Sequence, residues 1–328
     1  MMIDIFAHIL PLKYMQTVKR LSLINPDYTD RTLSLSDLDV RFRITDQYHG
    51  YLQVLSVPGF YRIITEGKNK AVELAGMAND GMAELVLKYP DRFVTAVACL
   101  PLNDMDAALK EAERAIDDLR FRGVEIWATN DKPLDMPEFM PLYEMMCSHN
   151  LPVWIHPMRM PSVPDYADEE ESKYGINSVF GWVYETTSAM TRLVFGGLLQ
   201  KYPDIKFITH HCGAMVPYLS ARIVSHYDNY EMIWGKPYKK GLTKHPIDYF
   251  RMFYNDTALN GNTAALNCAY DFFGVERLLF ATDMPFDSQL GDVSIRETIN
   301  AIEEMPISGS EKKMIFEDNA RRLMRLPI

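Results

Sequence analysis

Eight short runs rich in β-branched and aromatic residues recur along this chain, and a longer segment separates each run from the next. Several of these segments have helical spacing, so the alternation predicts parallel strands joined by helices. The expected strands are residues 2–8, 51–57, 93–100, 123–128, 153–156, 206–210, 252–257 and 277–282. Eight such units in one chain favour a closed α/β barrel.

The segments between the strands agree with this interpretation. Residues 104–119 predict an amphipathic helix, because alanines and Ile116 recur on one face. Residues 12–38 and 158–177 are polar, contain proline and follow strand ends, so we expect irregular loops that carry the active site. No shift in composition marks a linker, and residues 1–328 are expected to form one domain.

Charge and cysteine content exclude several classes of protein. Acidic residues outnumber basic ones by 44 to 34, and no basic cluster appears, which argues against a nucleic-acid partner. The 4 cysteines include no C-x-x-C pair, and the first residues lack the features of a secretion signal. No apolar run is long enough to cross a bilayer. We therefore expect a soluble, cytoplasmic protein without a membrane partner.

Side chains that can bind metal fall at the ends of the expected strands. His8 ends the first strand, His156 the fifth, His210 and His211 the sixth, and Asp283 the eighth. Because a barrel gathers the carboxyl ends of its strands at one rim, these residues are expected to meet there. Imidazole and carboxylate donors in one place predict a divalent-metal site with room for water or substrate. For any one histidine taken alone, simple packing is the more frequent role.

Four segments at these strand ends also carry a family resemblance: residues 3–11, 153–157, 211–217 and 281–286. They resemble the amidohydrolase superfamily, in the branch that contains aminocarboxymuconate semialdehyde decarboxylase and the hydroxybenzoate decarboxylases. Residues 46–47, 185–187, 253–256 and 318–323 fit the same branch. The resemblance covers nearly the whole chain and is more specific for the family than for a substrate.

This resemblance implies a distorted (β/α)8 TIM barrel with one divalent metal ion. The family binds it through an H-x-H pair, a histidine on the fifth strand and an aspartate on the eighth, which assigns His8, His156 and Asp283 as ligands. Phe6 stands where the pair has its first histidine and makes that side of the site apolar, against the substrate. Three protein ligands still leave a workable open site, so we expect a metal ion to bind. Zinc is the expected ion, with manganese or magnesium as alternatives. The other interpretation of Phe6 is a barrel that has lost its metal.

The resemblance also suggests roles for nearby residues. His211 reproduces the family's spacing to Pro217 and Arg222, so His211 is expected to act as general base or to position water, and Asp283 as ligand and proton donor. Alternation along the strand turns His210 away, behind the site, unless a bulge lets it replace the missing ligand. Arg222 matches an arginine that reaches a substrate carboxylate across a dimer interface in related decarboxylases, and we therefore expect a homodimer. Arg159 is a weaker candidate for the same anion.

Together these features favour a metal-dependent, non-oxidative decarboxylase of a small aromatic or unsaturated carboxylic acid. One alternative is a metal-dependent hydrolase or hydratase of the same superfamily, acting on a lactone or amide. A second alternative is a non-catalytic, metal-free barrel, which Phe6 would favour. Release of carbon dioxide and analysis of bound metal distinguish the three.

Overall fold

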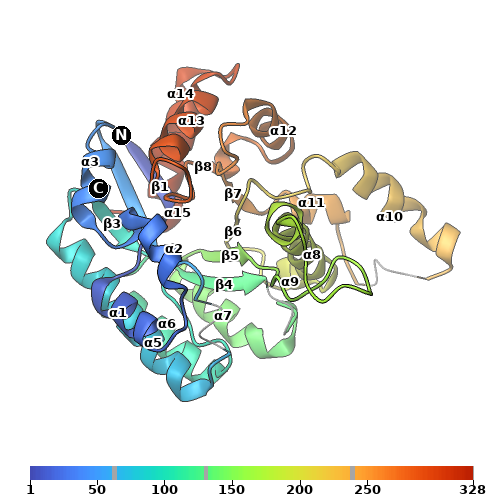
Figure 1. The fold of residues 1–328 in the computed structure, drawn as a ribbon. Helices are drawn as coiled ribbons and strands as arrows, with labels where there is room; N and C mark the ends of the chain where they lie inside the picture. The colour runs from blue at the N-terminus through green and yellow to red at the C-terminus, as the bar shows by residue number, and fades with distance from the viewer. Residues whose placement is uncertain (61–64, 129–131, 237–240, 328) are drawn as a thin grey trace.

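The computed structural model describes residues 1–60, 65–128, 132–236 and 241–327. Parallel strands lie at its centre and helices surround them (Figure 1). The strands are β1 (Met2–His8), β2 (Tyr51–Ser56), β3 (Phe93–Ala96), β4 (Val124–Ala128), β5 (Val153–Pro157), β6 (Phe207–Thr209), β7 (Tyr254–Asp256) and β8 (Leu278–Leu279). One sheet has the order β1-β2-β3 and the other the order β4-β5-β6-β7-β8. The expected parallel α/β fold is confirmed.

The two sheets meet at both of their edges through single bridges. Ala98, just after β3, pairs with Val124 of β4, and Ala7 of β1 pairs with Met284, just after β8. At the second junction the Asp283 N–H donates to the Phe6 carbonyl at 3.0 Å. The first and last strands are therefore neighbours, and the ring of strands is distorted at these two places.

Helices follow most strands and pack against their outer faces (Figure 1). They are α1 (Leu12–Arg20), α2 (Pro26–Arg31), α3 (Leu38–Thr45), α5 (Lys68–Lys88), α6 (Met105–Asp117), α7 (Met140–His149), α8 (Trp182–Phe195), α9 (Leu198–Lys201), α10 (Ser220–Trp234), α11 (Pro246–Phe250), α12 (Thr263–Phe273), α13 (Asp292–Glu303), α14 (Gly309–Lys313) and α15 (Asn319–Met324). The expected helix at 104–119 is α6, and the Asp104 carboxylate caps it by accepting from the Ala107 N–H at 3.2 Å. Within the described ranges, no helix is long and apolar enough to cross a membrane.

Alternate residues on the strands face two different cores. One cluster lies between strands and helices, and a smaller one fills the inside of the barrel. From the strands and the residues just after them, the inner cluster takes Ile3, Ile5, Phe6, Val54, Val97, Trp154, Ile208, Leu279 and Ala281. Leu323 and Met324 of α15 pack against them. Inward-facing side chains nearer the carboxyl end of each strand point toward the rim at that end of the barrel.

Two expectations about boundaries are wrong. Residues 12–38 are not an irregular loop, because Tyr14 and Val18 lie one helical turn apart, are both buried, and anchor α1. Several strands are also shorter than expected: β8 has 2 residues and β6 has 3. Their continuations leave the ladder early and form the rim loops. By contrast, the expected loop at residues 158–177 has no helix or strand up to residue 175, and its last two residues, Ile176 and Asn177, begin the helical segment that leads into α8.

Candidate active site

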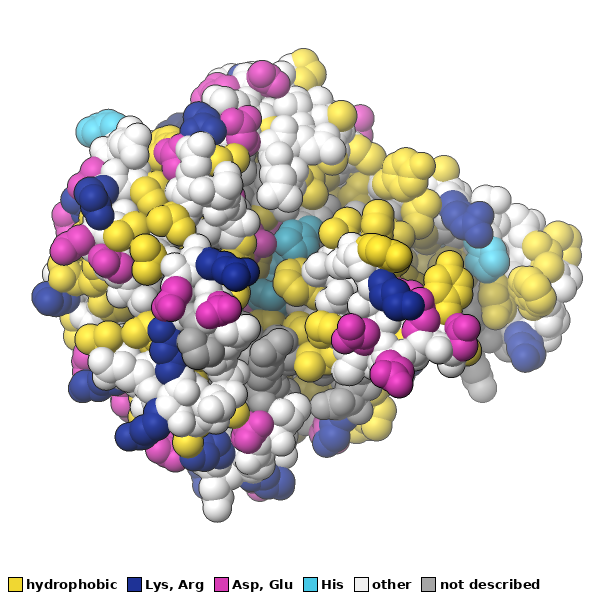
Figure 2. All heavy atoms as spheres, in the orientation of Figure 1, with side chains coloured by type: hydrophobic (Ala, Val, Ile, Leu, Met, Phe, Trp, Pro, Cys, Tyr) yellow, Lys and Arg dark blue, Asp and Glu magenta, His cyan; other side chains and the backbone are white. Residues whose placement is uncertain are grey.

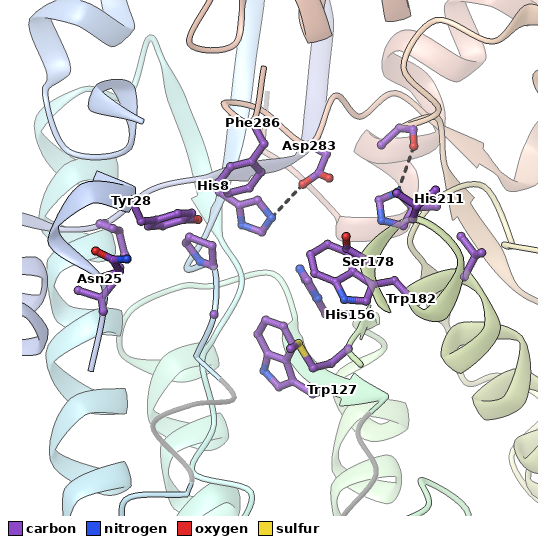
Figure 3. Close-up of a pocket in the computed structure, with 18 of the residues that line it drawn as sticks. His8, Asn25, Tyr28, Trp127, His156, Ser178, Trp182, His211, Asp283 and Phe286 are labelled. Carbon is purple, nitrogen blue, oxygen red and sulfur yellow. Dashed lines mark hydrogen bonds and ion pairs between the residues drawn. The ribbon is translucent and has the colours of Figure 1, made fainter. Parts of the chain in front are cut away.

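A cavity of about 890 Å³ opens at the carboxyl ends of the strands (Figures 2 and 3). His8 from β1, His156 from β5, His211 after β6 and Asp283 after β8 all line it. The structure therefore brings these four residues to one cavity. Trp127, Trp182, Tyr28 and Phe286 add aromatic walls, and Leu10, Val18, Leu23, Ile24 and Leu259 add aliphatic ones. No lysine or arginine is among the described residues that line this cavity.

His8 and Asp283 are in direct contact. His8 Nε2 lies 3.1 Å from Asp283 Oδ1 (Figure 3), and His8 Nδ1 lies 3.0 Å from the Ser56 hydroxyl. The imidazole is buried, whereas Asp283 is partly exposed to the cavity. Asp283 has φ +57°, a left-handed conformation that directs its carboxylate back toward β1.

His156 presents a free nitrogen lone pair in its neutral form. Its Nδ1 lies 2.7 Å from the Pro157 carbonyl and can only donate to that oxygen, so Nε2 is left without a proton. Burial, and then the nearby His210 and His8, lower the pKa of His156 well below its usual value. The Trp127 ring packs against it with centroids 4.0 Å apart. A neutral, oriented imidazole of this kind is a competent metal ligand.

His211 lies in a strained turn that places it on the cavity wall. His211, Cys212, Gly213 and Ala214 all have positive φ, from +54° to +75°. Gly213 is required there, because a Cβ would lie 2.6 Å from the Phe273 ring. His211 Nδ1 lies 3.1 Å from the Ala258 carbonyl, which fixes the ring and leaves Nε2 for substrate or water (Figure 3). Strain of this kind concentrates at functional positions.

Phe6 lies beneath the histidines and does not line the cavity. The register between β1 and β2 shifts between Asp4 and Ala7, and this bulge turns both Ile5 and Phe6 inward. The Phe6 ring lies 4.5 Å from His8 and 5.5 Å from His156, centroid to centroid. Its assignment as a substrate contact stays a prediction.

Asp4 holds this bulge in place. Its carboxylate accepts from the Phe6 N–H at 3.0 Å, the Thr282 hydroxyl at 2.6 Å and the Tyr51 hydroxyl. Burial raises the pKa of Asp4 to about 6, although each of these hydrogen bonds acts in the opposite direction. Asp4 therefore ties the first strand to the segment that carries Asp283.

His210 is fully buried on the inner wall of the barrel. Ile208 belongs to the inner cluster, and His210, two residues later, shares that face. Its ring stacks on Phe6 with centroids 3.5 Å apart and lies 5.1 Å from the His156 ring. Asp256 Oδ2 lies 2.9 Å from His210 Nδ1. The helix that follows, α12, is capped by Asn262, and Asp256 is engaged with His210 instead.

Glu125 is a buried acid that the sequence interpretation missed. It lies on β4 between the outward-facing Val124 and Ile126, and so inside the barrel. Both carboxylate oxygens are buried without a hydrogen-bond partner. Burial, and then the charge of Asp283, raise the pKa of Glu125 well above its usual value. An acidic residue at an inward position of a buried strand was the available signal.

The two candidate arginines lie outside this cavity in the same chain. Arg159 lies 3.4 Å from Glu185 and donates to the Pro164 carbonyl at 3.4 Å, with its side chain packed against Gly181. Arg222 is exposed on α10, and forms no hydrogen bond or ion pair with another described residue. None of the described residues of α10 is buried. Both substrate-binding assignments stay predictions.

The donors suit a divalent ion in their chemistry. In the part of the chain that the structure describes, no three His, Cys, Asp or Glu side chains stand close enough together to enclose an ion. The pair His8 Nε2 and Asp283 Oδ1, however, has a separation of 3.1 Å. Two atoms bound about 2.1 Å from one ion lie roughly 3.0–3.4 Å apart, so this pair matches the spacing of two ligands.

The amidohydrolase family model matches residues 3–326. This chain belongs to the amidohydrolase family. It is 32% identical over 311 residues to the gamma-resorcylate decarboxylase of Polaromonas sp. (strain JS666), a match that covers 92% of this chain and 90% of that protein. The gamma-resorcylate decarboxylase of Rhizobium sp. (strain MTP-10005) is 30% identical over 297 residues, covering 88% and 87%.

Comparison with a solved structure also supports the amidohydrolase fold. The crystal structure of dihydroxybenzoic acid decarboxylase from Polaromonas sp. JS666, with bound manganese and the inhibitor 2-nitroresorcinol, superposes with a TM-score of 0.82 at 27% identity. The match covers 99% of this chain and 96% of that chain. The expected family and fold are confirmed.

Proposed function

We propose that this amidohydrolase is a metal-dependent, non-oxidative decarboxylase of a small aromatic carboxylic acid. The observation that carries the proposal is the meeting of His8, His156 and Asp283 at one cavity with aromatic walls. The similarity to gamma-resorcylate decarboxylases over most of the chain supports it.

His8, His156 and Asp283 would hold the ion. When bound, the ion supplies a Lewis acid that polarises the substrate's oxygens. The ion is proposed to be a single divalent cation, zinc or manganese. The described lining contains no lysine or arginine, so a bound ion would supply positive charge for a substrate carboxylate on this side.

The protein's own groups would then carry the proton. Asp283, partly exposed to the cavity, donates a proton to the ring carbon that bears the carboxylate. The bond between that carbon and the carboxylate breaks, its electron pair stays with the ring, and carbon dioxide leaves. Water returns a proton to Asp283. His211, held through Nδ1 by Ala258, positions substrate or water and stabilises developing charge.

The walls select an aromatic substrate. Trp127, Trp182 and Phe286 present flat apolar surfaces near His8 and His156, with His8 and Phe286 centroids 5.3 Å apart. A substrate ring packed between them displaces water from the carboxylate, which strengthens the electrostatic interactions in the site.

The test is an assay of protein loaded with manganese or zinc on a panel of hydroxybenzoates, run in D₂O. Decarboxylation releases carbon dioxide and leaves one deuterium at the former carboxyl-bearing carbon, which proton NMR detects. Opening of lactones, esters or amides without carbon dioxide release would favour the hydrolase alternative. No turnover of either kind by metal-loaded protein would contradict the proposal.

A further inference from the structure

We propose that His210 is a ligand of the metal ion and supplies the donor that Phe6 cannot. This inference rests on the metal dependence in the proposed function. The family resemblance does not assign His210, and strand alternation alone pointed it away from the site.

The orientation of His210 is fixed by a buried carboxylate. His210 Nδ1 donates to Asp256 Oδ2 at 2.9 Å, and Asp256 Oδ1 accepts from the N–H groups of Cys212 at 3.0 Å and Ala258 at 3.1 Å. Both side chains are fully buried. Histidines that bind metal commonly donate their other ring N–H to a carboxylate, which sets the tautomer and the ring direction.

The second nitrogen of His210 has no use in the described structure. Nε2 is buried and has no hydrogen-bond partner. With Nδ1 donating to Asp256, the neutral ring keeps its lone pair on Nε2. A buried acceptor left without a partner is unfavourable, and such atoms in native structures usually serve a function or bind something. An ion on the inner wall would satisfy this nitrogen.

The spacing of the rings matches a shared ion. The His156 and His210 centroids lie 5.1 Å apart, and those of His8 and His156 lie 5.6 Å apart. Two imidazoles bound through nitrogens about 2.1 Å from one ion, at near-tetrahedral angles, have centroids about 5 Å apart. The ring spacing therefore fits a shared ion, although the side chains must rotate before their donor atoms enclose one, because no three such side chains among the described residues do so here.

Phe6 accounts for the rest of the arrangement. Its ring stacks on His210 with centroids 3.5 Å apart and an angle of 26° between the planes. This contact keeps His210 on the inner wall and excludes water from one face of the imidazole. A histidine at position 6 would occupy the space that the Phe6 ring fills. In this chain the apolar ring stands at position 6, and His210 beside it provides the nitrogen ligand.

Two substitutions separate ligation from packing. His210→Asn keeps a hydrogen-bond donor for Asp256 near the Nδ1 position and removes the Nε2 nitrogen that would bind the ion. His210→Gln places an amide near the Nε2 position and gives up the Asp256 contact. His49→Asn, at an exposed loop position, is the matched control. Chelator-treated full-length protein is titrated with MnCl₂ and ZnCl₂ by calorimetry, and far-UV circular dichroism without metal confirms folding.

We expect His210→Asn to weaken binding of both ions more than tenfold, His210→Gln to weaken it less, and the control to match wild type. The visible absorption bands of cobalt-substituted protein should shift or lose intensity in both His210 variants and stay unchanged in His49→Asn. Unchanged affinity and spectrum in a folded His210→Asn protein overturn the proposal, as does a wild type that binds neither ion. Should His210→Asn not fold, Asp256→Asn replaces it, with the same loss of affinity expected.

These results separate the inference from the proposed function. A loss of metal affinity in His210→Asn supports the ligand role even if no aromatic acid is decarboxylated. Decarboxylation by a protein whose metal affinity is independent of His210 leaves the proposed function intact and refutes the ligand role.

Discussion

His8 and Asp283 come from opposite ends of the chain, yet their side chains meet with Nε2 and Oδ1 3.1 Å apart. The backbone pairing of Ala7 with Met284 brings them together, since each residue lies next to a bridge partner. Asp4 reinforces the same junction through Thr282. The contact therefore depends on the closure of β1 against the segment after β8.

Replacing Asp283 removes both a proposed ligand and the proposed proton donor. We expect Asp283→Asn to lower metal content and to reduce kcat by about a hundredfold or more, because a neutral amide is a poor ligand and cannot transfer the proton. Metal analysis and the carbon dioxide assay measure the two effects. Asp271→Asn, at an exposed position on α12, is the control. Wild-type rate and metal content in Asp283→Asn would remove this residue from the mechanism.

Phe6→His restores a nitrogen donor beside His8. Because the ring at position 6 lies 4.5 Å from His8 and 5.5 Å from His156, a histidine there can share the ion, and tighter metal binding is expected. Phe6→Leu is the matched control, since it removes the ring without adding a donor. Calorimetric titration of both variants is the measurement, and equal affinity in the two would show that position 6 is out of reach of the ion.

Arg222 tests whether a second copy of the chain completes the site. The side chain is exposed on α10 and does not line the cavity of its own chain. If the Arg222 side chain reaches a substrate carboxylate across a dimer interface, Arg222→Ala should raise KM tenfold or more, with a smaller effect on kcat. The reason is that the variant loses one pair of charge-assisted hydrogen bonds to the substrate.

Steady-state kinetics and light scattering check this prediction together. Arg20→Ala, also exposed, should leave KM unchanged. A monomeric wild type, or an Arg222→Ala protein with unchanged KM, would mean that Arg222 does not contact substrate.

The raised pKa of buried Glu125 predicts that the protein loses stability as pH rises. Its pKa is raised in the folded protein above the ordinary value of 4.5, so the unfolded chain releases this proton first as pH rises. This residue therefore makes the free energy of unfolding fall as pH rises above about 4.5. Glu125→Gln should be more stable than wild type near pH 7, by about 1–3 kcal/mol, and close to wild type below pH 4.

Urea unfolding from pH 4 to pH 8 measures this effect. Glu113→Gln, at an exposed position of α6, should follow wild type throughout. A Glu125→Gln protein that loses stability at pH 7 would show that the carboxylate has a partner essential to the fold.

The strand pattern was sufficient to predict the barrel and the rim. His8, His156, His211 and Asp283 each follow a run of buried residues, and parallel strands place such positions at one end. The helix α1 was missed because most residues around the buried Tyr14 and Val18 are polar, and these two side chains find their packing partners only in the folded barrel.

Other parts of the site depend on contacts between residues far apart in the sequence. The bulge that turns Phe6 inward is held by Asp4 with Tyr51 and Thr282, and no local pattern around residue 6 encodes it. The partnership of His210 with Asp256 likewise joins β6 to β7. Alternation alone could not show which face of β6 is the inner one, because the strand is 3 residues long.

The closure of β1 against the β8 end also sets an order of events during synthesis. His8 leaves the ribosome well before its partner Asp283, because seven of the eight strands are made between them. A partly made chain therefore cannot assemble the pair, and a cation that binds there stabilises the finished protein over every shorter intermediate. A cation held by this pair would thus be bound only after the segment that follows β8 has been made.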